Sequence, residues 1–224
     1  MSAISTRAGY RLWAPSYNSE TAISHLDNLI VADLGVATAR RDLLDVGCGT
    51  ARRLRQSDAT LAVGVDLTFE MLGGTSREHP LSVADVRALP FAPESFDVVW
   101  CRLVIGHVQN LEIAYAELSR VCRPGGAVVV SDICPEAIDA GHRRTFRDSA
   151  GVEHELEHHV HTPAAHAHAA FDVGLKLKTL RDGVVDESIR DFYERAGRIV
   201  AYERQLGLPL VRVLSWRKLT RAAA

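Results

Sequence analysis

Short apolar segments that alternate with amphipathic segments restrict the fold of this chain more than any other feature. Four runs have the length of a strand and are mostly apolar: residues 42–46, 60–66, 95–101 and 125–133. Between the last two, the helical segment 110–123 carries its apolar residues on one stripe. Strands without a polar face need cover on both sides, as in a parallel sheet between two layers of helices. We therefore predict an α/β domain with an open, doubly wound, mostly parallel sheet.

Other segments predict further elements around this sheet. Residues on both sides of Ser149-Ala150-Gly151 favour a hairpin, and the remaining segments predict a helix at 20–38, a helix at 162–174, a strand at 175–183, a charged amphipathic helix at 188–207 and a last strand at 208–219. No repeat and no low-complexity linker divides the 224 residues. We expect residues 1–224 to form a single domain.

Composition and charge exclude several classes of partner. The formal net charge is −2, so no general cationic field favours nucleic acid. No run of eighteen apolar residues predicts membrane insertion, and the first ten residues do not resemble a secretory signal. The four cysteines are too scattered to form a zinc site or a disulfide scaffold. A cytoplasmic protein with reduced thiols is expected, and the oligomeric state stays open.

A glycine-rich turn follows the first of the apolar strands. The segment Asp45-Val46-Gly47-Cys48-Gly49-Thr50 places two glycines where the backbone has to turn sharply and where a ligand can approach closely. Asp66 closes the next strand, and a carboxylate there can accept two hydrogen bonds from a ribose diol. Asp85 ends a third strand and can accept a bond from an exocyclic amine. This arrangement predicts a nucleoside site at the carboxyl edge of the sheet.

Two kinds of nucleoside cofactor fit such a turn. The dinucleotide fingerprint requires a third glycine for close packing of helix on strand, and this chain has Arg52 at that position. An NAD-dependent oxidoreductase is therefore the less favoured alternative. A non-catalytic nucleoside-binding protein is a second alternative, because a fold alone does not determine function.

Four segments resemble the class I S-adenosylmethionine-dependent methyltransferases, in the branch that methylates small molecules and quinones. They are LLDVGCGT (43–50), VGVDLTFEML (63–72), VADVRALPFAPESFDVVWC (83–101) and ELSRVCRPGGAVVVSD (117–132). The resemblance implies a Rossmann-like sheet of seven strands with an inserted lid, and S-adenosylmethionine as cofactor with S-adenosylhomocysteine as product. It divides the domain into an N-terminal helical cover (1–40), a cofactor-binding core (41–133) and two substrate-lid segments (134–162 and 183–207).

The same resemblance implies roles for individual residues. Gly47 and Gly49, with Asp45 at the strand end, would contact the methionine part of the cofactor, and Asp66 would hold the ribose hydroxyls. The adenine would be bordered by Leu67 and Met71 and bound by Asp85 and Val86, and backbone groups of Arg102 and Leu103 would meet the methionine amine. Aromatic rings suit a cationic sulfonium, and the aromatic residues expected to cover it are Tyr10, Trp13 and Tyr17.

The expected reaction is an in-line displacement that moves the methyl group to O, N, S or C of a small-molecule acceptor, with a specialised metabolite as the expected substrate. Such a reaction depends on holding donor and acceptor in line and on excluding water. A general base is needed only where the nucleophile enters protonated. The candidate bases are His107, which follows the fourth strand, and His158 and His161 in the lid segment.

The segment HELEHHVH (154–161) matches the H-E-x-x-H pattern of zinc hydrolases. That pattern requires a helix, which would bring His154 and His158 onto one face. Here apolar residues and histidines alternate with glutamates, which is typical of a strand. Four residues of strand span roughly 13 Å, too far for two imidazoles to share one metal ion. We therefore predict no zinc hydrolase and assign no metal ligands, and a surface metal site made from His159, His161 and a neighbour stays open as an alternative.

Overall fold

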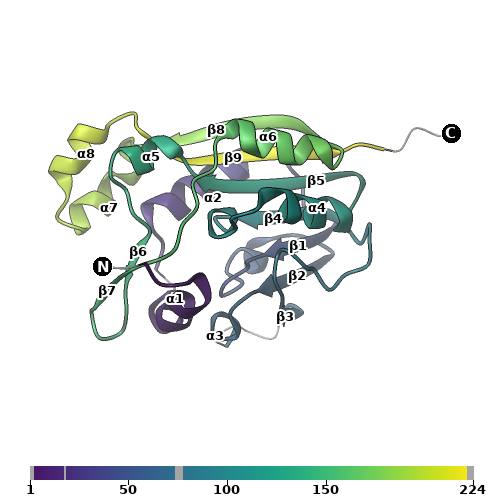
Figure 1. The fold of residues 1–224 in the computed structure, drawn as a ribbon, viewed down its shortest axis with the longest axis horizontal. Helices are drawn as coiled ribbons and strands as arrows, with labels where there is room; N and C mark the ends of the chain where they lie inside the picture. Colours follow the sequence, from purple (N-terminus) through teal and green to yellow (C-terminus); the bar gives the residue numbers. More distant parts are fainter. Residues whose placement is uncertain (1–2, 18, 74–77, 221–224) are drawn as a thin grey trace.

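A computed structural model describes residues 3–17, 19–73 and 78–220. Its main sheet has seven strands in the order β3-β2-β1-β4-β5-β9-β8 (Figure 1). Their bounds are β1 Asp42–Val46, β2 Leu61–Asp66, β3 Leu81–Val83, β4 Phe96–Arg102, β5 Cys122–Ile133, β8 Leu175–Val184 and β9 Pro209–Lys218. Only β9 runs antiparallel to its neighbours in this sheet. The predicted open, doubly wound, mostly parallel sheet is confirmed.

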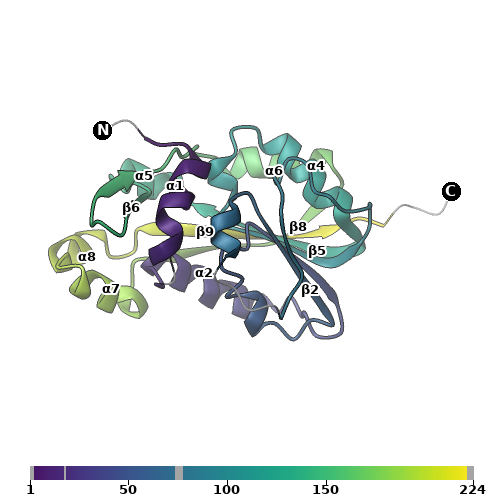
Figure 2. The same ribbon diagram turned by 90° about the horizontal axis from the view of Figure 1, so that it is seen from below.

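Helices cover both faces of the sheet, as the apolar strands require. Figure 2 shows α2 (Ala22–Asp33) on one face and α4 (Leu111–Val121) with α6 (Pro163–Asp172) on the other. The side chains of Asn110 and Thr162 accept backbone N–H bonds at the starts of α4 and α6, which fixes where these two helices begin. Tyr115, Leu118 and Trp216 are fully or almost fully buried between this layer and the sheet.

Two helix predictions differ from the structure. The helix expected at 20–38 ends at Asp33, shortly before Gly35, whose φ is +65°. The single helix expected at 188–207 is wrong. The chain there forms the 3-10 turn η4 (Glu187–Ile189), α7 (Arg190–Arg195) and α8 (Ile199–Gln205), and Gly197 between the helices has a φ of +65°. A left-handed residue cannot continue a right-handed helix, so apolar periodicity alone overestimates both lengths.

The N-terminal segment and the hairpin meet at the carboxyl edge of the sheet. The segment comprises α1 (Thr6–Trp13) and η1 (Ala14–Ser16), and the hairpin, which follows α5 (Pro135–Asp139), pairs β6 (Thr145–Arg147) with β7 (Glu153–Glu155). Figure 1 shows both below α5. The N–H of Ile4 donates to the carbonyl of Glu155, and the ring of Trp13 stacks on Phe146 with centroids 4.9 Å apart. Three further short elements are α3 (Phe69–Leu72), η2 (Leu54–Gln56) and η3 (Ile105–His107).

Candidate active site

A cavity of about 460 Å³ opens where β1, β2 and β4 end. Eleven of the thirteen residues expected to bind the cofactor line it: Tyr10, Tyr17, Gly47, Gly49, Asp66, Leu67, Met71, Asp85, Val86, Arg102 and Leu103. Trp13 and Asp45 do not line this cavity. Of the three histidines expected to act in catalysis, only His107 does. The parallel strands explain this convergence, because their carboxyl ends meet at one edge.

The glycine turn after β1 has the conformation that only glycine adopts easily. Gly47 and Gly49 have φ values of +73° and +55°. A Cβ atom on Gly47 would lie 2.1 Å from a methyl carbon of Val104, and one on Gly49 would lie 3.2 Å from the Met71 methyl. The N–H groups of Gly47 and Cys48 both donate to the carbonyl of Val65, which ties the turn to β2. The turn is therefore packed closely against Val104 and Met71, and a side chain at Gly47 would clash with Val104.

Asp66 occupies the place where a carboxylate can meet a diol. One oxygen accepts the N–H of Gly49 and the other that of Thr68, each at 2.9 Å. Each carboxylate oxygen has two lone pairs, so each can accept one further hydrogen bond, and Asp66 lines the cavity. Burial raises the pKa of Asp66 from its usual value, and the two backbone bonds oppose this rise.

Asp85 also lines the cavity, but it is engaged with a neighbour. The guanidinium of Arg87 donates to both carboxylate oxygens of Asp85, and the backbone N–H of Arg87 donates to one of them at 2.9 Å. These bonds lower the pKa of Asp85. Val86 and Met71 beside it are buried and supply apolar wall. An amine at this point would share the carboxylate with Arg87.

A buried cluster of charges lies between α2 and the strand ends. Asp27, which is fully buried, accepts from Arg102 at 2.7 and 3.0 Å and from Arg53 at 3.3 Å. Asp45 is also fully buried, and neither of its oxygens has a hydrogen-bond partner in the described part of the chain. Burial raises the pKa of Asp45 to about 6, against the opposing charges of Arg53 and Arg102. Asp27 and Arg53 were not predicted as site residues, although an aspartate beside Leu26 on the apolar face of a helix was a signal for Asp27.

Hydrogen bonds define the protonation of His107. Its Nδ1 lies 3.1 Å from the carbonyl of Glu157, so Nδ1 carries a proton and donates. Its Nε2 lies 3.1 Å from the Tyr10 hydroxyl, so in the neutral ring Nε2 accepts a hydrogen bond that this hydroxyl donates. Burial lowers the pKa of His107 well below its usual value, and the charge of Arg144 adds to this. His107 is thus a neutral imidazole at the wall of the cavity.

The structure places His158 and His161 away from this cavity. The Nε2 atom of His158 lies 3.8 Å from a carboxylate oxygen of Asp132, and His161 donates to the carbonyl of Val108 at 2.9 Å. Burial opposes ionisation of Asp132, but its contacts with His158 and His166 outweigh burial and lower its pKa to about 2. These histidines secure the segment after β7 against β5 and η3. Asp132 was missed because nothing in the sequence shows which residues it meets.

The strand interpretation of HELEHHVH is confirmed for its first residues. His154 lies in β7 and bonds the Asp148 carboxylate at 2.8 Å, whereas His158 contacts Asp132. The two imidazoles of the H-E-x-x-H pattern therefore have separate partners. Across the described ranges no group of three potential metal-ligating side chains comes together, and no helix is long and apolar enough to cross a membrane.

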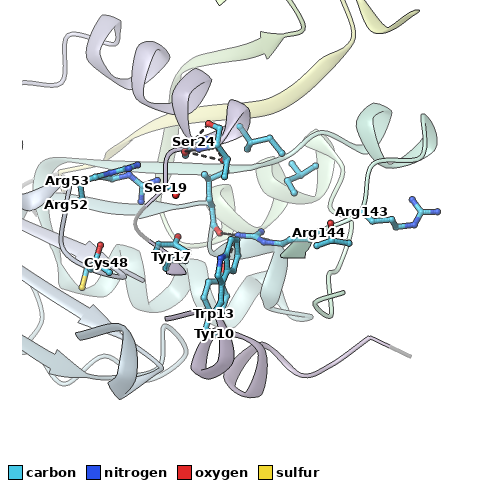
Figure 3. Close-up of a pocket in the computed structure, with 16 residues that line it drawn as sticks. Tyr10, Trp13, Tyr17, Ser19, Ser24, Cys48, Arg52, Arg53, Arg143 and Arg144 are labelled. Atoms are coloured by element: carbon cyan, nitrogen blue, oxygen red, sulfur yellow. Dashed lines mark hydrogen bonds between the residues drawn. The ribbon is translucent and has the colours of Figure 1, made fainter. Parts of the chain in front are cut away.

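A second cavity, of about 190 Å³, adjoins the first on the side of the hairpin (Figure 3). The two cavities share four lining residues: Tyr10, Tyr17, Arg53 and Leu103. Trp13 lines the second cavity, together with Arg143 and Arg144 of the lid segment. Leu103 has a φ of +59°, a strained conformation for a side chain of this size. A shared wall gives the site two compartments in direct contact.

Comparisons with known proteins identify relatives and fold neighbours. Residues 44–130 match the methyltransferase domain family. A malonyl-[acyl-carrier protein] O-methyltransferase of Salmonella typhimurium is 33% identical over 133 residues, covering 51% of this chain and 52% of that protein. A demethylmenaquinone methyltransferase of a Mycobacterium species is 40% identical over 108 residues, covering 45% of each. The chain spans about half the length of the curated relatives it matches.

Among solved structures, an S-adenosylmethionine-dependent methyltransferase from Mesorhizobium loti superposes with a TM-score of 0.66. The alignment covers 88% of this chain and 98% of that one at 18% sequence identity. At this identity the similarity concerns the fold, and it extends well beyond the residues that the family match covers.

Proposed function

Because this chain carries a methyltransferase domain over residues 44–130 on a class I methyltransferase fold, we propose that it transfers a methyl group from S-adenosylmethionine to a small-molecule acceptor. The family, and S-adenosylmethionine as its cofactor, agree with the expectation from the sequence. The observation that carries the proposal is the pair of cavities that meet at Tyr10, Tyr17 and Leu103, with Asp66 and the glycine turn in the larger one.

The residues of the larger cavity fit the cofactor. Asp66 can accept two further hydrogen bonds, as the ribose hydroxyls require, and Gly47 and Gly49 expose backbone to the same cavity. Met71 and Val86 supply apolar walls for the adenine, as the resemblance implied. When bound, the cofactor would supply an activated methyl group. The bond from this carbon to sulfur breaks as a lone pair of the acceptor forms a bond to the carbon. The acceptors named for the two relatives differ from each other, so neither is assigned to this chain.

The chain's own groups orient the acceptor and receive its proton. Tyr10 lines both cavities, and its hydroxyl reaches Nε2 of His107. A protonated acceptor would pass its proton to the Tyr10 oxygen while the Tyr10 proton moves to Nε2 of His107. The imidazolium formed keeps its Nδ1–H bond to the Glu157 carbonyl. The Tyr10–His107 pair is therefore the candidate general base, and a weak one, because burial and the charge of Arg144 lower the pKa of His107.

The low pKa of His107 can be tested without an acceptor. A free histidine titrates near pH 6.5, whereas the lowered pKa of His107 means that the folded protein disfavours the proton there. The unfolded chain takes up that proton as pH falls below about 6.5, so this group destabilises the fold on the acid side. We expect ring ¹⁵N spectra, assigned with His107→Gln, to show a neutral Nδ1–H tautomer that persists below about pH 6.5, where a free histidine is protonated. Protonation near pH 6.5 would contradict the lowered pKa, and a proton on Nε2 of the neutral ring would contradict the hydrogen-bond assignment.

The proposed function is tested by thermal shift with S-adenosylhomocysteine and NAD. A ligand at a hundred times its dissociation constant adds about 2.7 kcal/mol, which is a shift of roughly 5–10 °C for a domain of this size. We expect that shift with S-adenosylhomocysteine and none with NAD. The reverse result would favour the oxidoreductase alternative. Transfer of labelled methyl from S-adenosylmethionine to an acceptor then separates an enzyme from a non-catalytic nucleoside-binding protein.

A further inference from the structure

The wall of the second cavity is positively charged. Four arginines line it, namely Arg52, Arg53, Arg143 and Arg144, and none of its lining residues within the described chain is an aspartate or glutamate. Three of these arginines pair with carboxylates that do not line the cavity, with nitrogen-to-oxygen distances of at most 4.0 Å. The pairs are Arg52 with Glu20, Arg53 with Asp27 and Arg143 with Glu155. Arg144 has no carboxylate partner among the described residues. One positive charge in the cavity wall is therefore uncompensated.

The guanidinium of Arg144 is held in place but only partly satisfied. Its Nη2 donates to the carbonyl of Leu103 at 2.6 Å and to the hydroxyl of Tyr10 at 3.1 Å. Its Nη1 is buried and has no hydrogen-bond partner in the part of the chain that is described. Figure 3 shows this guanidinium beside Tyr10 and Trp13, whereas Arg143 points away from them. A buried cationic donor without a partner is costly, and an anion at Nη1 would remove that cost.

Aromatic rings form a wall beside Arg144. Trp13 stacks on Tyr10 with centroids 5.7 Å apart, and Tyr17 meets Trp13 edge-on at 4.9 Å. Phe146 supports Trp13 from the other side. The rings are therefore fixed by one another before any ligand arrives. Such a wall accepts a flat or apolar group, while the adjoining guanidinium accepts oxygen atoms that carry negative charge.

We propose that the second cavity selects acceptors with an anionic oxygen group, a carboxylate or a phosphate, which Nη1 of Arg144 binds while the aromatic wall holds the apolar part. This inference rests on the proposed function, because it treats the smaller cavity as the acceptor compartment. It restricts the proposed class of acceptor from small molecules in general to small molecules that carry an anionic group. Since Arg144 also bonds Tyr10, the bound anion lies beside the residue common to both cavities.

The test measures the affinities of three matched probes with S-adenosylhomocysteine present at saturation. Benzoate and phenyl phosphate carry the two anionic groups, and benzamide is the neutral counterpart of benzoate. We expect at least one anion to bind the wild type roughly 10- to 100-fold more tightly than benzamide, as for a hydrogen bond to a charged group. The anion that shows this preference distinguishes a carboxylate site from a phosphate site.

Arg144→Met should abolish this preference, whereas Arg147→Met should keep it. Arg147 lies in the same hairpin and carries the same charge, but its side chain is 67% exposed and lines neither cavity. The ratio of affinities is insensitive to a general loosening of the wall, which would weaken all three probes. Equal affinities in the wild type, or an unchanged ratio in Arg144→Met, would overturn the anion site. Failure of S-adenosylhomocysteine itself to bind would instead refute the proposed function.

Discussion

Asp66→Ala is expected to weaken S-adenosylhomocysteine binding by at least about 100-fold. Two hydroxyl donors on one ionised carboxylate each contribute about 1.5–3 kcal/mol, and tenfold in affinity corresponds to about 1.4 kcal/mol. The carboxylate is held in a single orientation by the N–H groups of Gly49 and Thr68, so no rearrangement precedes binding. Isothermal titration calorimetry of the variant and the wild type measures the effect directly.

The variant also loses two backbone bonds, and this cost has to be separated from the loss of binding. We expect the free energy of unfolding to fall by about 1–2 kcal/mol, leaving the protein folded at 25 °C. Asp58→Ala, an exposed position just before the other end of β2, is the matched control and should bind as the wild type does. Unchanged affinity in Asp66→Ala, measured on folded protein, would remove Asp66 from the ribose site.

The sheet was predictable because its determinants are local. β1, β2 and β4 each lie within one residue of the apolar runs that predicted them, and the glycine turn and Asp66 follow from their positions at strand ends. A strand buried on both faces shows this in its own composition. The same reasoning explains why Gly47, Asp66 and Asp85 line one cavity, since the carboxyl ends of parallel strands must converge. The other residues expected to bind the cofactor, such as Tyr10 and Met71, were predicted from the family resemblance.

The rest of the site depends on contacts between distant segments. His107, His158 and His161 looked alike in the sequence, yet one meets Tyr10 in the cavity, one lies against Asp132, and one bonds the carbonyl of Val108. Which partner each histidine meets is decided by how the lid segment crosses β5. Arg144 offered no signal at all, because its importance comes from an unsatisfied nitrogen and not from its residue type.

The second large effect concerns the ion pair that joins α2 to β4. Asp27 and Arg102 are almost completely buried, and removing one partner of such a pair leaves the other charge buried without its counter-ion. Breaking a buried pair in this way costs about 3–5 kcal/mol. Burial alone already lowers the pKa of Arg102, so its charge depends on Asp27 for compensation. Asp27→Leu is therefore expected to lower the free energy of unfolding by about 3–5 kcal/mol in urea denaturation.

Arg102→Met and the double variant decide whether this loss comes from the unpaired charge or from packing. If the charge is responsible, Asp27→Leu with Arg102→Met loses less than the sum of the single variants, because Arg102 no longer leaves a buried guanidinium without a counter-ion. Arg53 loses its bond to Asp27 in Asp27→Leu and in the double variant alike, so its contribution cancels between them. Strict additivity would mean that the two residues act independently and that the pair does not hold α2. Since Arg102 also lines the cofactor cavity, the double variant should regain stability without regaining wild-type affinity for S-adenosylhomocysteine. Stability and binding would then be separate consequences of one buried pair.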